Sequence, residues 1–167
     1  MTDKFSNHLR NLGRSIWLAQ SQHPFIQGIG DGTLDIKNLE YWVKQDYLYL
    51  IDFAQVYYLA SSRTSDPTVS EWLLSQSEFT LHKELALHLS YAKDLGIGHD
   101  KLRKTTKSPT CQAYTDFLIR TAAVEPFSMT IAALLPCFWG YYELGLGLEK
   151  KGLPDNELYA RWILQYT

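Results

Sequence analysis

Apolar residues recur at helical spacing along most of the chain, and this pattern predicts an all-α protein. Near the start, Phe5, Leu9, Leu12 and Ile16 are four and three residues apart, so they share one face of a helix over about residues 5–20. The alternation of apolar and polar residues that is typical of strands is weak throughout. We therefore expect a helical domain without a sheet.

Caps and helix-breaking residues mark the limits of the predicted helices. Pro67 fits the first turn of one helix, where Thr68 and Glu71 have the spacing of a capping box. Ser108 is the expected N-cap of another helix. The segment "HPFIQGIGDGTL" (23–34) is rich in glycine and proline and is predicted to be a loop. The later helices are expected over about 35–61, 67–96, 108–124 and 126–151, with a last one from 155.

The last predicted helix has no stop signal. Leu158, Trp162 and either Ile163 or Tyr166 form an apolar stripe, and the sequence ends at Thr167 without a glycine, a cap or a polar tail. We therefore expect the sequence to be cut short within a single helical domain that contains all 167 residues. If the chain ended there, the apolar faces of the first helix and of the last two helices would be bare.

Composition and charge narrow the classes of function. The chain is 46% apolar with a formal net charge of −2, which is typical of a globular protein. The basic cluster "KLRKTTK" (101–107) is interpreted as a solvated loop, so we expect no nucleic-acid partner. The start of the chain lacks the apolar core of a signal peptide, and no apolar run approaches the roughly 20 residues of a membrane span. We therefore expect a cytoplasmic protein with no membrane partner, in which Cys111 and Cys137 are reduced thiols.

Asp46 interrupts the apolar face of the helix predicted over 35–61. Its neighbours on that face are Leu39, Trp42, Val43, Tyr49, Leu50, Phe53, Val56 and Tyr57. Burying a carboxylate costs several kcal/mol unless the group is paired or hydrogen-bonded. Two interpretations stay open: a neighbouring tyrosine or lysine satisfies the acid, or the acid lines a cavity and binds a polar ligand.

The segment "ALLPCFWGYYELG" (133–145) places a thiol and four aromatic rings directly after a proline. Pro136 cannot donate to the carbonyl of residue 132, so the helix should kink there. Cys137 and Tyr141 are four residues apart and share a helix face. The cysteine is either a nucleophile in a pocket or a small buried apolar residue, and the sequence pattern alone leaves both open.

Tyrosine is abundant, with eleven residues, and four tyrosines lie on or near inward-facing stripes: Tyr49, Tyr114, Tyr141 and Tyr166. Each ring by itself fits an ordinary core. Together with a buried acid, rings that carry a polar end suit a pocket that stacks a flat heterocycle.

Two acid–histidine pairs are spaced like helical metal ligands, namely Glu78 with His82 and Glu84 with His88. On a regular helix, His82 and Glu84 point about 200° apart, so the two pairs face different directions. We therefore expect no metal site.

Five motifs, in this order, resemble the TenA/thiaminase II family along the whole sequence: "HPFIQGIGDGTL", "YWVKQDYLYL", "SPTCQAYTDFL", "ALLPCFWGYYELG" and "YARWILQY". The resemblance implies an all-α bundle similar to haem oxygenase and a homotetramer. It also implies hydrolysis of thiamine-related aminopyrimidines without a metal or organic cofactor. The expected reaction converts 4-amino-5-aminomethyl-2-methylpyrimidine to the hydroxymethylpyrimidine and ammonia, with cleavage of thiamine as a side activity.

The resemblance also implies roles for individual residues. Cys137 matches the nucleophile that adds to the pyrimidine ring, and Tyr141 a tyrosine close to it. Asp46 matches an aspartate that binds a ring nitrogen and the 4-amino group of the pyrimidine. Three further tyrosines match residues of the pyrimidine pocket: Tyr49, Tyr114 and Tyr166.

The sequence departs from the family pattern in one respect. Family members continue for several more helices after the position that corresponds to Thr167. One of these helices carries a glutamate that acts as catalytic acid and base, and no glutamate of this sequence matches that position. A pyrimidine-binding homologue without activity is therefore an alternative. A transcriptional regulator and a metal oxidase on the same scaffold are further alternatives, although the near-neutral charge and the lack of a basic recognition helix argue against direct DNA contact.

Overall fold

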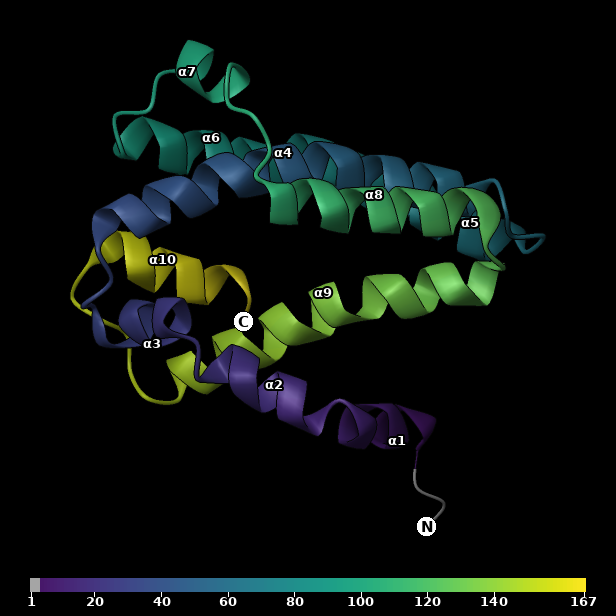
Figure 1. Cartoon of the computed structure of the whole chain (residues 1–167), viewed down its shortest axis with the longest axis horizontal. Helices are drawn as coiled ribbons and strands as arrows, with labels where there is room; N and C mark the ends of the chain where they lie inside the picture. The colour runs from purple at the N-terminus through teal and green to yellow at the C-terminus, as the bar shows by residue number, and fades with distance from the viewer. Residues whose placement is uncertain (1–3) are drawn as a thin grey trace. The chain divides into compact units, whose positions relative to one another are not determined.

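The computed structural model describes residues 4–167, and every regular element in that range is a helix (Figure 1). The all-α prediction is therefore confirmed. The elements are α1 (Phe5–Leu12), α2 (Arg14–Ser21), α3 (Pro24–Asp31), α4 (Ile36–Ser61), α5 (Pro67–Phe79), the π-helix η1 (Thr80–Glu84), α6 (Leu85–Asp94), α7 (His99–Arg103), α8 (Pro109–Val124), α9 (Phe127–Glu149) and α10 (Glu157–Gln165).

One compact unit comprises Ile36–Pro136 and is built around α4. The long α4 packs against α5, α6 and α8, which run beside it in Figure 1. The side chains buried in this unit are mainly apolar and aromatic, and they include Leu39, Val43, Tyr57, Leu73, Tyr91, Leu102 and Leu118. His88 is buried among them, which is unusual for an ionisable side chain.

The other compact unit combines the N-terminal residues up to Asp35 with the segment Cys137–Thr167. Trp162, Tyr159 and Ile29 are fully buried there, and the Tyr159 hydroxyl donates to the carbonyl oxygen of Leu34 at 2.6 Å. The two units divide inside α9, between Pro136 and Cys137, and α9 continues through the proline.

The apolar stripe of α1 and α2 is largely exposed. Phe5, Leu12 and Ile16 each have more than 70% of their surface accessible. Arg10, on the same helix, makes a two-pronged ion pair with Glu143 of α9, with both N–O distances at 2.7 Å. A specific polar contact therefore attaches α1 to α9, while most of its apolar face is uncovered.

The prediction of a loop over 23–34 is wrong, because α3 occupies most of it. His23 caps the helix, since its ring Nδ1 accepts from the Phe25 amide at 3.2 Å. Gly28 and Gly30 lie inside the helix and serve close packing instead of ending it. A Cβ atom at Gly30 would lie 2.6 Å from a Leu148 methyl, and α3 ends only at Gly32, whose φ of +78° is left-handed.

Two predicted helices are interrupted. The helix expected over 5–20 breaks at Gly13, between α1 and α2. The helix expected over 67–96 contains the π-helical turn η1 between α5 and α6. Pro67 lies in the first turn as predicted, but the capping box is wrong: the Asp66 carboxylate caps α5 by accepting from the amide of Thr68 at 2.9 Å.

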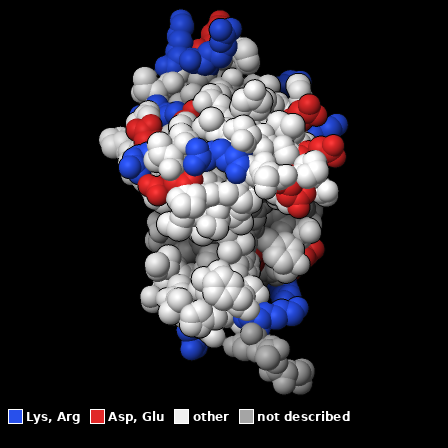
Figure 2. Space-filling model, turned by 90° about the vertical axis from the view of Figure 1, so that its right-hand side faces the viewer, with Lys and Arg blue, Asp and Glu red and all other residues white. Residues whose placement is uncertain are grey.

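The interpretation of 101–107 as a solvated loop is also wrong in part. Lys101 and Arg103 belong to the short helix α7, while Lys107 forms a largely buried ion pair with Asp52. Figure 2 shows basic side chains gathered at the end of the molecule where Figure 1 draws α7, and acidic and basic side chains interspersed below them.

Within the described residues, α9 is long and apolar enough to cross a membrane by length and composition. One such helix is weak evidence, because a core helix of a globular protein passes the same test. The sequence-based expectation that no apolar run approaches the length of a membrane span therefore does not hold for α9, by length and composition.

Candidate functional site

Asp46 lies on the inward face of α4, and its side chain is only 12% exposed. Its partner is His88 of α6, whose Nε2 atom lies 2.6 Å from Oδ2 of Asp46. The two atoms are within ion-pair distance but are not aligned as a directed hydrogen bond. Of the two interpretations offered for Asp46, the first named a tyrosine or a lysine as partner, whereas the partner is a histidine.

The other ring nitrogen of His88 is also engaged. Nδ1 lies 2.9 Å from the backbone carbonyl oxygen of Glu84, one turn earlier. A carbonyl oxygen can only accept, so Nδ1 carries a hydrogen. The ring is further enclosed by Trp42, whose ring centroid is 5.2 Å away, and the histidine is 1% exposed.

The surroundings shift the pKa of His88 in opposite directions. Burial lowers it, because the low-dielectric interior disfavours the charged ring. The Asp46 carboxylate raises the pKa through its charge and contact, and the net shift of the His88 pKa is upward. The imidazolium form is therefore favoured beside Asp46.

Glu84 ends the π-helical segment η1, and π turns occur often at functional sites. Burial raises the pKa of its carboxyl group, and the nearby Asp46 charge raises it further, against the effect of the Thr80 hydroxyl, which lowers it. Among residues 4–167, no group of three or more His, Cys, Asp or Glu residues is arranged to hold a metal ion.

An aromatic row extends from Asp46 along α4. Tyr49, Phe53 and Tyr57 are spaced four residues apart, and their neighbouring ring centroids are 5.0 Å and 4.9 Å apart. Tyr114 of α8 adds a ring to the row, parallel to Tyr49 within 3° at a centroid distance of 5.8 Å. Tyr49 is 8% exposed and Tyr114 is 37% exposed, so the outer ring of the row is accessible.

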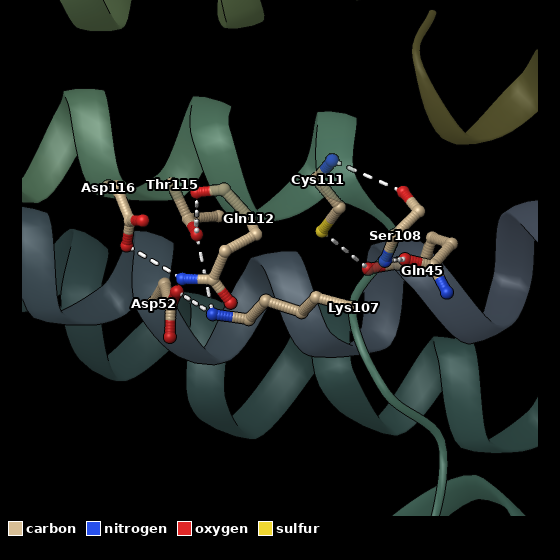
Figure 3. Close-up of polar contacts among 8 residues, drawn as sticks. All are labelled: Gln45, Asp52, Lys107, Ser108, Cys111, Gln112, Thr115 and Asp116. Atoms are coloured by element: carbon tan, nitrogen blue, oxygen red, sulfur yellow. Dashed lines mark hydrogen bonds and ion pairs between the residues drawn. The ribbon is translucent and has the colours of Figure 1, made fainter.

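Polar contacts fix the start of α8 against α4 (Figure 3). The Gln45 amide uses both ends: Oε1 accepts from the Ser108 amide at 2.7 Å, and Nε2 donates to the Thr106 carbonyl at 3.1 Å. Ser108 then caps α8, as the sequence predicts, by accepting from the Cys111 amide at 3.2 Å. Gln45 precedes Asp46, so the same turn of α4 carries the acid and holds α8.

The ion pair of Lys107 with Asp52 continues this contact, and the Lys107 ammonium also donates to the Thr115 hydroxyl at 3.3 Å. Cys111 lies nearby, with its thiol 3.6 Å from the Gln45 carbonyl oxygen. Burial raises the pKa of the Cys111 thiol, and Lys107 offsets this only in part. Cys111 is therefore disfavoured as a thiolate nucleophile.

The second group of aromatic residues lies in the unit that contains Cys137. The Tyr141 ring is 4.5 Å from that of Tyr166 between centroids, and Trp162 packs against both. Cys137 is half-buried one helical turn before Tyr141. Gly145 makes this arrangement possible, because a Cβ atom there would lie 2.9 Å from the Tyr166 backbone oxygen.

The same unit contains an open cavity of about 580 Å³. Its lining combines apolar and polar residues and consists of Leu18, Ser21, Gln22, Ile26, Gln27, Leu144, Gly147, Leu148 and Lys151. None of the six residues for which the sequence predicts a role in the site belongs to this lining.

Comparison with known proteins identifies the family. Residues 12–167 match the family described as TENA/THI-4/PQQC. The chain belongs to this family. An aminopyrimidine aminohydrolase of Halalkalibacterium halodurans is 39% identical over 166 residues, which are 98% of this chain and 73% of the relative. Another from Bacillus subtilis is 37% identical over 98% of this chain and 69% of the relative.

Solved structures of the TenA family share the fold. A TenA family transcription regulator of Silicibacter sp. TM1040 matches with a TM-score of 0.91 at 27% identity, over 98% of this chain and 72% of that chain. A TenA homologue of P. horikoshii matches with a TM-score of 0.89 at 26% identity, over 96% and 76% of the respective chains. The family resemblance read from the five motifs is confirmed.

The six residues with predicted TenA-family roles fall into two groups. Asp46, Tyr49 and Tyr114 belong to the unit built around α4, where the two tyrosines stack and Asp46 is one turn from Tyr49. The other three belong to the other unit, where two of them are in ring contact: Cys137, Tyr141 and Tyr166.

Sequence reasoning missed His88 as the partner of Asp46 and weighed it only as a metal ligand paired with Glu84. A usable signal was present. His88 stands among the apolar residues Leu85, Leu87 and Leu89 of the helix, and Asp46 stands on an apolar stripe of another. Two ionisable residues that each interrupt an apolar pattern are candidates to form a buried pair, in which each offsets the cost of burying the other's charge.

Proposed function

We propose that this chain is a hydrolase of thiamine-related aminopyrimidines. Its relatives in two organisms are named aminopyrimidine aminohydrolases, and the identity of 37–39% extends over almost the whole chain. The proposed reaction is the conversion of 4-amino-5-aminomethyl-2-methylpyrimidine and water to the hydroxymethylpyrimidine and ammonia. The observation that carries the proposal is the largely buried Asp46 carboxylate beside an aromatic row.

Asp46 is proposed to bind the polar edge of the pyrimidine. A 4-aminopyrimidine presents an amino donor next to a ring nitrogen, and a carboxyl group is complementary to both. The accessible Tyr114 ring offers a flat surface for the heterocycle, with Tyr49 behind it. Tyr141 and Tyr166, whose rings contact each other, are proposed as further substrate-binding residues.

Cys137 is proposed to be the nucleophile. Addition of its thiolate to a ring carbon pushes an electron pair onto a ring nitrogen, which a carboxyl group stabilises or protonates. The electron pair then returns to expel the amine at the 5-methylene, which takes up a proton and leaves as ammonia. Water adds to the methylene, the thiolate leaves the ring, and no oxidant or reductant is needed.

The test is an ammonia-release assay on the aminomethylpyrimidine with a matched pair of cysteine variants. We expect Cys137→Ser to lower kcat by at least about a thousandfold, since a hydroxyl is a far weaker nucleophile, while the affinity for the hydroxymethylpyrimidine is retained. Cys111→Ser should keep most of the activity, because a hydroxyl can replace its weak contact with Gln45. Full turnover by Cys137→Ser would exclude its role as nucleophile.

The same assay addresses a pyrimidine-binding homologue without catalysis, which is the second candidate. The chain spans 69–73% of the length of these two relatives. Binding of the hydroxymethylpyrimidine without ammonia release would support this candidate. An intact mass measured on the same preparation shows whether the assayed protein is the 19.2 kDa chain.

A further inference from the structure

The contacts of His88 leave few choices for its hydrogens. Nδ1 faces the Glu84 carbonyl at 2.9 Å and must carry a hydrogen. Nε2 lies 2.6 Å from Oδ2 of Asp46, and two bare acceptors at that distance would repel each other. The pair therefore holds one further proton, on Nε2 or on the Asp46 carboxyl group, and the pair as a whole is close to neutral.

The pair also fixes the direction of the carboxyl group. Oδ2 faces the imidazole, so Oδ1 is the oxygen that is to accept from the amino group of the ligand, and the proton held by the pair is the one that can be offered to its ring nitrogen. His88 cannot turn away, because it is 1% exposed and its ring is held by the Glu84 carbonyl and packed against Trp42 and Tyr91. The imidazole thus determines both the orientation and the charge balance of the acid.

We propose that His88 is a positioning residue that acts through Asp46, presenting one carboxylate oxygen to the bound aminopyrimidine. The proposal deepens the proposed function and rests on it for the identity of the ligand. The backbone carbonyl of Glu84, which lies in the π turn η1, accepts from His88 Nδ1. The π turn therefore helps to orient Asp46 through His88.

The first experiment examines the pair in the absence of ligand. Histidine ring signals are followed by NMR from pH 5 to pH 10 in the wild type and in Asp46→Asn, and the signal that disappears in His88→Gln identifies the residue. The charged groups that face His88 are Asp46 from α4 and Glu84 from η1. We expect His88 to titrate above the ordinary histidine range of about 6.5 in the wild type and clearly lower in Asp46→Asn. The same titration in both proteins would overturn the proposal.

The second experiment is a double-mutant cycle on pyrimidine use. We expect His88→Gln to raise the KM for the aminomethylpyrimidine at least about tenfold, with a smaller change in kcat, because the acid loses a charged partner. His88→Leu should raise the KM further than His88→Gln does, since glutamine can still donate a hydrogen bond to Asp46 and leucine cannot. The KM of the double variant His88→Gln/Asp46→Asn should be no higher than that of Asp46→Asn alone. Additive losses would mean that His88 does not act through Asp46 and would overturn the proposal.

The matched control is His99→Gln, an exposed histidine on α7 and outside the π turn η1. It should leave both the His88 titration and the KM unchanged. Thermal melting of each variant checks that the fold is retained. If the wild type neither binds nor hydrolyses the pyrimidine, the proposed function fails, while the NMR titration still decides whether His88 and Asp46 form the pair.

Discussion

The rings of Tyr49 and Tyr114 lie parallel within 3°, with their centroids 5.8 Å apart, although α4 and α8 contribute one each. Parallel offset rings are a favoured arrangement of aromatic pairs. The gap leaves no room for a third ring between them, because two successive stacking layers of about 3.5 Å would be needed. Of this pair of rings, the accessible outer face of Tyr114 is therefore the one on which a flat ligand can stack.

Tyr114→Ala should weaken binding of the hydroxymethylpyrimidine about tenfold, because it removes the accessible stacking face. Tyr114→Phe retains the ring and should change the Kd by less than about threefold. Titration calorimetry gives both values. Equal affinities of Tyr114→Ala and the wild type would mean that the ligand does not stack on this ring.

Gly145 and Gly147 form a matched pair on α9. An alanine Cβ at Gly145 would collide with Tyr166 at 2.9 Å, whereas nothing lies within 4 Å of a Cβ at Gly147. Gly145→Ala should therefore destabilise the fold by roughly 1–3 kcal/mol, and Gly147→Ala should stabilise it by up to about 1 kcal/mol. Urea unfolding followed by tryptophan fluorescence measures both, and a stabilising Gly145→Ala would show that Tyr166 moves aside without cost.

The ion pair of Lys107 and Asp52 is largely buried, with 18% and 14% of the two side chains exposed. Lys107→Met leaves the Asp52 charge unpaired and should destabilise the protein by about 2–4 kcal/mol. The double variant Lys107→Met/Asp52→Leu removes both charges and should recover most of that loss. Unfolding free energies of the three proteins provide the test, and no recovery in the double variant would contradict a desolvated pair.

The raised pKa of His88 predicts how stability depends on pH. A group whose pKa is higher in the folded state stabilises the fold below its unfolded pKa of about 6.5. That contribution is lost as the pH rises through the higher folded pKa. The difference in unfolding free energy between the wild type and His88→Gln should therefore shrink from pH 6 towards pH 10.

The raised pKa of Glu84 likewise contributes to the free energy of unfolding, but over a lower pH range. Its contribution is complete below the ordinary glutamate pKa of about 4.3 and falls as the pH rises through the higher folded value. Urea titrations at intervals of one pH unit show both effects. A difference between wild type and His88→Gln that grows with pH would contradict the assigned direction for His88.

The fold class could be predicted from the sequence because apolar spacing reports directly on helix faces, as it does for α4 and α8. The helix α3 could not, because a glycine that permits close packing looks the same in sequence as one that breaks a helix. Gly30 is the example, since its role depends on Leu148, which is 118 residues away.

The candidate site could be predicted only as far as local pattern reaches. Asp46 is conspicuous because a charge interrupts an apolar stripe. Its partner His88 is 42 residues further along the chain, on a helix whose regular phase is changed by the π turn η1, so spacing rules based on 100° per residue do not apply across it. Pairings between helices depend on packing, which periodicity does not report.

The double contact of Gln45 with the segment before α8 also provides a physical reporter on the site. The Ser108 amide hydrogen is held by the Gln45 side chain at 2.7 Å, outside any helical ladder. Its exchange with deuterium therefore requires α8 to lift from α4 or Gln45 to let go. Exchange of this one backbone amide thus reports how often the Gln45 contact at the start of α8, the helix that carries Tyr114, opens.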